Sequence, residues 1–112
     1  MEANRLHLRE ILRKVMVDCD EEPRLYYQPD STFKLAYPCM LYHLRTLTKQ
    51  SADNTPYFRT ISFDVTYITK SPLSKVPTAM LEIPCMSFDR YYTSENLHHY
   101  AYTYTENLKK GE

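Results

Sequence analysis

The chain has 112 residues, 14 basic and 14 acidic side chains, a formal net charge of zero and a single glycine, Gly111. The length fits one domain spanning residues 1–112, and the balanced charge disfavours a nucleic-acid-binding protein, which usually carries a basic excess. The near absence of glycine excludes the phosphate-binding P-loop and the dinucleotide fingerprint. No apolar run approaches the ~18 residues of a membrane span, and the N-terminus lacks the apolar core of a signal peptide. We therefore expect a protein of the cytoplasm with no membrane partner.

The N-terminal segment predicts an amphipathic helix over residues 4–17, with Asn4 as its N-cap. Its apolar residues recur at helical spacing. They are Leu8, Ile11, Leu12, Val15 and Met16.

Three strand candidates follow. Residues 24–28 predict a short strand, and residues 38–49 and 57–69 predict two longer ones. The last of these alternates most clearly, with Ile61, Phe63, Val65 and Tyr67 on one face. The polar loop at 50–56 would join the two longer strands into a long β-hairpin.

The C-terminal third predicts a short helix that starts at Pro77 and closes before Pro84. Residues 88–99 then read as an irregular return, residues 100–105 as the last strand, and residues 106–112 as a polar tail. The fold class is therefore α+β: an antiparallel sheet packed by an N-terminal helix and by a short helix before the last strand.

Chemistry-bearing residues are sparse. His98 and His99 would point to opposite faces of a strand and could not chelate one metal ion together. Cys19, Cys39 and Cys85 are expected to be buried thiols, since nothing local supplies the base of a nucleophilic cysteine. Cys39 and Cys85 could lie next to each other in the sheet. We predict no enzyme activity, no cofactor and no metal.

The polar residues among the tyrosines suggest contacts instead. Asp89 and Arg90 would form either a brace within the chain or a contact between subunits. Asp53 and Asn54 are either turn residues or part of a loop that reaches a neighbouring subunit. Tyrosine and arginine are enriched at protein interfaces.

An ordered block of short motifs runs through residues 35–104. It comprises Tyr37-Pro38-Cys39, Ala52-Asp53-Asn54 with Tyr57, Asp64-Val65-Thr66 with Ile68, and Phe88-Asp89-Arg90 with Tyr92, Asn96-Leu97 and His99. In order and spacing this block resembles the tail-terminator or tail-completion proteins at the head–tail junction of long-tailed bacteriophages.

The resemblance implies a virion structural protein of the neck, assembled in the host cytoplasm as a ring, usually a hexamer. Its partners would be the tail tube protein and the head-completion, adaptor or portal-side proteins. Such a ring recognises no DNA sequence, although DNA passes through its lumen. The alternative is a head-completion or adaptor protein bound on the portal side. The predicted interface residues are Asp53, Asn54, Asp89, Arg90, Tyr92, Asn96, His99 and Tyr102.

Overall fold

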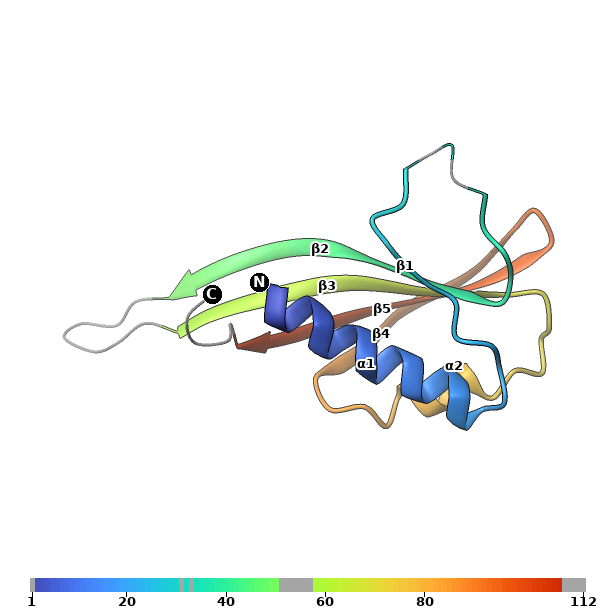
Figure 1. Ribbon diagram of the computed structural model, residues 1–112, viewed down its shortest axis with the longest axis horizontal. Coiled ribbons are helices and arrows are strands. Elements are labelled where there is room, and N and C mark those ends of the chain that lie inside the picture. The colour runs from blue at the N-terminus through green and yellow to red at the C-terminus, as the bar shows by residue number, and fades with distance from the viewer. Residues whose placement is uncertain (1, 31, 33, 51–57, 108–112) are drawn as a thin grey trace.

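A computed structural model describes residues 2–30, 32, 34–50 and 58–107. Its two helices are α1 (Glu2–Asp18) and α2 (Val76–Met80). Its strands are β1 (Leu25–Tyr27), β2 (Cys39–Gln50), β3 (Phe58–Thr69), β4 (Met86–Ser94) and β5 (Leu97–Asn107). They form a five-stranded sheet in the order β1-β2-β3-β5-β4 (Figure 1).

The sheet is antiparallel except at one edge, where the three-residue β1 runs parallel to β2. β2 and β3 pair along nearly their whole length, which confirms the long hairpin. The α+β fold class is likewise confirmed. Among the described residues no helix is long and apolar enough to cross a membrane.

The core lies between the helices and one face of the sheet, which we call the helix face. Leu8, Leu12 and Met16 of α1 are fully buried, as the helical spacing predicts. They pack in one cluster with Phe63 and Val65 of β3 and with residues of α2. Both helices therefore cover the same face, and α1 in Figure 1 lies across it.

Asn4 does not cap the helix as predicted, because α1 already starts at Glu2. Its side chain is buried, and Nδ2 donates to Oε1 of Glu106 at 2.6 Å and to the carbonyl of Asn107 at 3.0 Å. The predicted start of the polar tail at residue 106 is wrong, since β5 continues to Asn107, and residues 108–112 lie outside the described residues. Asn4 thus ties the start of α1 to the end of β5.

The largest departure from the sequence-based expectation is the segment 88–99. It is not an irregular return: most of it belongs to β4 and β5, which pair as a second hairpin with Ser94 opposite Leu97. Glu95 and Asn96 make the turn with φ of 53° and 65°. A two-residue hairpin turn of this kind requires positive φ at both positions, which usually selects Asn-Gly. The turn was missed because it contains no glycine.

Candidate interaction surface

The sheet face opposite the helices, which we call the open face, is lined by polar and charged side chains from four strands. They surround a hollow of about 560 Å³. Its lining includes His43, Arg45, Asp64, Thr66, Asp89, Arg90 and Tyr92.

Two β-bulges bring charged side chains into this hollow. The pairing of β2 with β3 shifts register between Leu44 and Thr46, which leaves Arg45 as an extra residue. The pairing of β4 with β5 shifts between Phe88 and Arg90, which leaves Asp89 as the extra residue. Bulges redirect side chains and are often found beside functional sites. Here both extra residues turn onto the open face and meet at Thr103.

Arg45, Asp64 and Asp89 belong to one hydrogen-bonded network. Nη1 of Arg45 lies 3.1 Å from Oδ1 of Asp64 and 3.4 Å from Oγ1 of Thr103. Nε2 of His43 lies 3.2 Å from Oδ2 of Asp64. The Thr103 hydroxyl donates to Oδ2 of Asp89 at 2.5 Å. This hydrogen bond holds Asp89 to β5 within the chain.

Arg90 does not share in this network. Its guanidinium lies 5.1 Å from the centre of the Tyr92 ring, and that ring stacks on His99 with centroids 4.6 Å apart. Such cation–π contacts orient a guanidinium without neutralising its charge. Among the described residues no carboxylate pairs with Arg90, so its N–H donors remain available to an acceptor from outside.

The adjacent residues His98 and His99 of β5 lie on opposite faces of the sheet, as predicted. His99 stacks on Tyr92 on the open face, while His98 accompanies Tyr91 on the helix face. The Tyr91 hydroxyl lies 2.7 Å from Nδ1 of His98. Each histidine is thus held by an aromatic partner across the strand pair.

The structure brings four of the predicted interface residues to the open face: Asp89, Arg90, Tyr92 and His99. A fifth, Asn96, lies in the hairpin turn between β4 and β5. Tyr102 is a correction: it is 1% exposed on the helix face, and its hydroxyl donates to the carbonyl of Pro77 at 2.9 Å. Asp53 and Asn54 lie outside the described residues.

Tyr100, Tyr102 and Tyr104 do share one face, but that face is the core rather than a wet surface. Tyr104 is 3% exposed, and its hydroxyl donates to Glu106. Burial raises the pKa of Tyr102 to about 12 and also raises that of Tyr104. These tyrosines are therefore structural, and the contact residues come from β4 instead.

Sequence reasoning missed His43 and Arg45. The available signal was the spacing of Leu44 and Leu47, which are three positions apart where a regular strand repeats one face every two residues. The bulge at Arg45 accounts for this spacing, because Leu44 and Leu47 pair with Phe63 and Ile61 of the core.

The cysteines behave differently from one another. Cys39 is buried, and burial raises the pKa of its thiol to about 11, so it stays protonated at neutral pH. Cys85 is exposed, which corrects the expectation of a buried thiol. The two cysteines are not neighbours. Cys39 pairs with Ile68, which lies opposite His99 near the start of β5, whereas the carbonyl of Cys85 accepts from Thr105 N near the end of β5.

The open face can bind polar groups through charge and hydrogen bonding. The described residues contain no group of three or more His, Cys, Asp or Glu side chains placed to hold a metal ion.

No protein-family model matches this chain, and no curated protein matches it at a significant level.

Proposed function

We propose that this protein is a virion structural protein of the head–tail junction of a long-tailed bacteriophage. It forms a ring that caps the tail tube, ends tube growth and joins the tail to the head connector. The proposal starts from the sequence resemblance described above and gains support from where the residues of that resemblance lie.

The observation that carries the proposal is the convergence of five of those residues on the open face. Asp64 and Thr66 come from β3, and Asp89, Arg90 and Tyr92 come from β4, yet all five line the same hollow. They are separated by up to 28 positions in the sequence, from 64 to 92. Polar residues that gather on one surface from distant parts of the chain are typical of a contact site, whereas Cys39, Val65 and Ile68 of the same motifs lie in the core.

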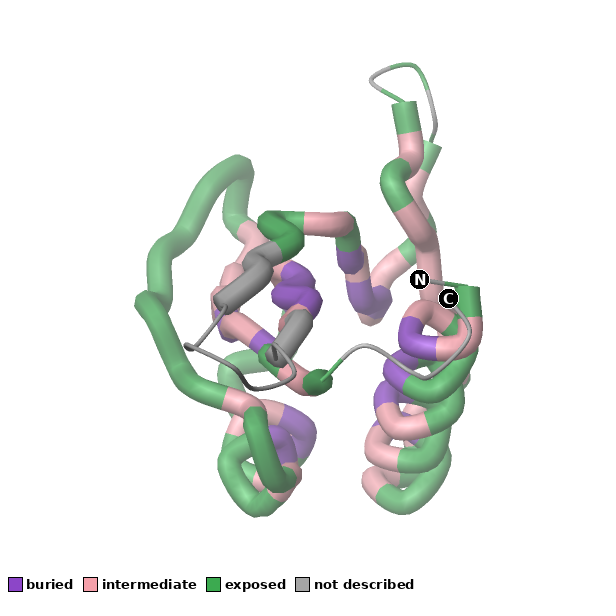
Figure 2. The backbone as a smooth tube through the Cα atoms, turned by 90° about the vertical axis from the view of Figure 1, so that its left-hand side faces the viewer, coloured by how far each residue is buried: buried purple, intermediate pink, exposed green. Residues whose placement is uncertain are grey.

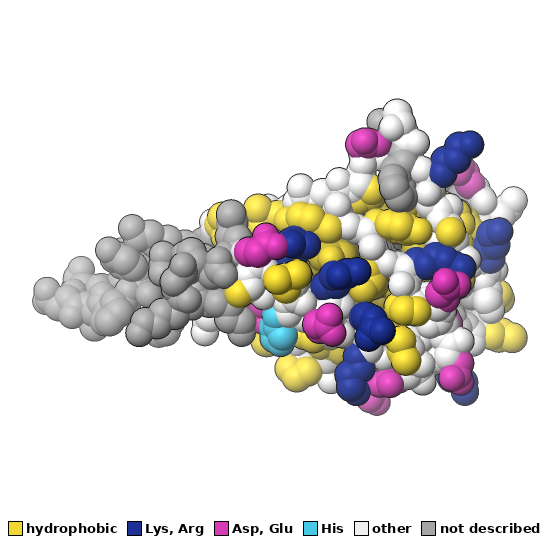
Figure 3. All heavy atoms as spheres, in the orientation of Figure 1, with side chains coloured by type: hydrophobic (Ala, Val, Ile, Leu, Met, Phe, Trp, Pro, Cys, Tyr) yellow, Lys and Arg dark blue, Asp and Glu magenta, His cyan; other side chains and the backbone are white. Residues whose placement is uncertain are grey.

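The shape of the domain also suits an assembly subunit. In the described part of the chain the helices cover one face of the sheet, and β2 and β3 extend beyond α1 as a long ribbon (Figure 1). The covered side mixes Lys, Arg, Asp and Glu side chains with apolar ones, as Figure 3 shows. The uncovered sheet face and the long ribbon do not form a closed pocket for a small substrate. Both leave wide surfaces on which neighbouring chains can bind.

The proposed mechanism is geometric. A tail tube grows by adding identical rings through a head-to-tail interface. A terminator binds the last ring with one surface and presents a different surface on the other side. The next tube subunit then finds no complementary surface, so growth stops.

The decisive experiment is to locate the chain in a virion reconstruction and to mix purified protein with tail tubes. Contact with tube subunits supports a terminator, whereas contact with the portal side alone supports an adaptor. The Arg90→Ala variant should bind tubes at least tenfold more weakly, while the matched variant Arg13→Ala, on the exposed side of α1, should bind normally. A protein that binds neither tubes nor connectors contradicts both roles.

A further inference from the structure

β4 is an exposed edge of the sheet. One of its sides pairs with β5, and no strand among the described residues covers the other. Every residue of β4 after Met86 is exposed, including three aromatic side chains: Phe88 and Tyr91 at 47% and Tyr92 at 37%. Figure 2 shows this edge as a continuous exposed tract. Such an edge is a template for another strand.

The pairing with β5 determines which backbone groups point outward. Ser94 and Leu97 flank the two-residue turn, and residues in that position exchange both of their hydrogen bonds. Because bonded and non-bonded pairs alternate along an antiparallel ladder, Tyr92 also faces β5. Tyr91 and Thr93 therefore direct their N–H and C=O groups away from the sheet.

The other half of β4 follows from its opposite end. Thr105 N donates to the carbonyl of Cys85 at 3.2 Å, which makes Cys85 a residue that faces β5. Alternation from there makes Ser87 face β5 as well, and it makes Met86 and Phe88 point outward. The outward-facing residues of β4 are Met86, Phe88, Tyr91 and Thr93.

The bulge at Asp89 gives this edge an unusual spacing. Outward groups recur every two residues in a regular strand. On β4 the outward groups of Phe88 and Tyr91 are three positions apart, because both Asp89 and Arg90 lie between them. A regular strand cannot follow this spacing, but an antiparallel copy of β4 reproduces it.

We propose that β4 pairs with β4 of a second copy of this chain about a two-fold axis between Asp89 and Arg90. In that register Phe88 faces Tyr91 of the second copy, and Met86 faces Thr93. Each of these pairs joins two residues whose backbone groups point outward. No other antiparallel register matches the spacing at the bulge.

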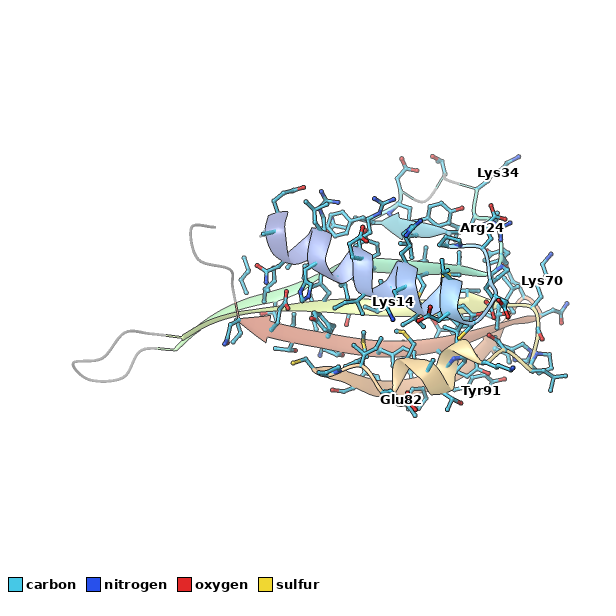
Figure 4. All side chains as sticks on the ribbon, turned by 60° about the horizontal axis from the view of Figure 1, so that its bottom comes forward. Lys14, Arg24, Lys34, Lys70, Glu82 and Tyr91 are labelled. Atoms are coloured by element: carbon cyan, nitrogen blue, oxygen red, sulfur yellow. The ribbon has the colours of Figure 1, made fainter. Side chains whose placement is uncertain are left out.

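The side chains agree with this register. Asp89 and Arg90 both lie on the open face, so Asp89 of each copy meets Arg90 of the other in two reciprocal ion pairs. Phe88 and Tyr91 pair with Tyr102 and Tyr100, which places them on the helix face, where they form two aromatic cross-strand pairs. Figure 4 shows Tyr91 at this edge of the sheet. The sequence aromatic–acid–base–aromatic is thus complementary to itself.

This contact does not depend on the proposed ring, but it uses Arg90, so a chain paired in this way does not present Arg90 to the tail tube. A two-fold contact uses the same patch on both copies and closes on itself, whereas ring growth is head-to-tail. The paired state covers the exposed edge of each chain and so protects it from uncontrolled strand addition.

Charge reversal tests the reciprocal ion pairs. We expect sedimentation equilibrium of the full chain to show dimers, and we expect Asp89→Arg or Arg90→Asp alone to weaken the dimer at least tenfold. The double variant Asp89→Arg with Arg90→Asp should restore it, because each new charge again meets its opposite. A monomeric wild-type protein would overturn the inference. Single variants with the same mass as the wild type would also overturn it, even if that mass is that of a hexamer.

Cross-linking tests the register independently of charge. In a Cys85→Ser background, Ser87→Cys with Tyr92→Cys places two thiols opposite each other across the two-fold axis at the ~4.5 Å Cα spacing of non-bonded pairs. Oxidation should give a covalent dimer. The control Ser87→Cys with Thr93→Cys puts the thiols on opposite faces and should stay monomeric in denaturant. Equal cross-linking of both, or of neither, would contradict the proposed register.

Discussion

The two faces of this sheet differ although the same strands build both. On β3, Phe63, Val65 and Tyr67 lie against the helices and are at most 1% exposed. Asp64 and Thr66, on the same strand, face away from the helices and line the polar hollow. The helix face therefore stabilises the domain through burial, and the open face contributes little to stability and is free to serve contacts.

The largest effect should come from the helix face. Phe63→Ala removes a buried ring from the core cluster and should lower the free energy of unfolding by about 3–5 kcal/mol. Thr66→Ala, three positions along the same strand on the open face, should change it by less than about 0.5 kcal/mol. Urea denaturation of both variants measures the difference. Similar losses in the two variants would contradict the assignment of the faces.

A second, intermediate effect should appear at alkaline pH. Burial, with a further contribution from Tyr100, raises the pKa of Tyr102 from 10 to about 12. The unfolded chain then releases this proton at a lower pH than the folded protein does, so the stabilising contribution is complete below pH 10 and is lost as the pH rises toward 12. Each group whose pKa is raised in this way makes the free energy of unfolding fall by about 1.4 kcal/mol per pH unit over that range.

Denaturant midpoints between pH 9 and pH 12 check this effect, and the variant Tyr102→Phe should show a shallower decline than the wild type. The pKa values of Tyr67 and Tyr104 are also raised by burial, so the variant should keep part of the slope. An unchanged slope would show that Tyr102 ionises as easily in the folded protein as in the unfolded chain.

The smallest effect is expected on the open face. Asp64→Asn removes the carboxylate that holds His43 and Arg45, both of which have half-exposed side chains. Exposed ion pairs contribute little, so the free energy of unfolding should fall by less than about 1 kcal/mol. The loss should shrink further at ~1 M salt, where the screening length is about 3 Å. A loss comparable to that of Phe63→Ala would make the network part of the core.

Regular periodicity explains why much of the fold was predictable. The stripe from Leu8 to Met16 identified α1, and the alternation from Ile61 to Tyr67 identified β3 and its buried face. Both patterns are local, and each reflects one continuous element with one covered side. The short helix before Pro84 could likewise be found from its flanking prolines.

The errors lie where a residue interrupts a local pattern. Asp89 is the extra residue of a bulge, so the alternation of β4 changes phase there and no longer resembles a strand. The hairpin turn uses Glu95 and Asn96 at positive φ without glycine, which removed the usual signal of a turn. Tyr102 was assigned to the surface because its hydroxyl can reach water, but the hydroxyl reaches Pro77 instead.

By itself the sequence determined the fold class, the amphipathic helix, the long hairpin and the fact that Tyr100, Tyr102 and Tyr104 share a face, since these depend on spacing along the chain. Only the tertiary structure decided that the tyrosines of β5 face the helices and belong to the core. It also decided that Arg45 and Asp89, 44 positions apart, meet at Thr103 through two bulges. Such a meeting depends on the order and register of strands that are distant in sequence, which no local pattern encodes.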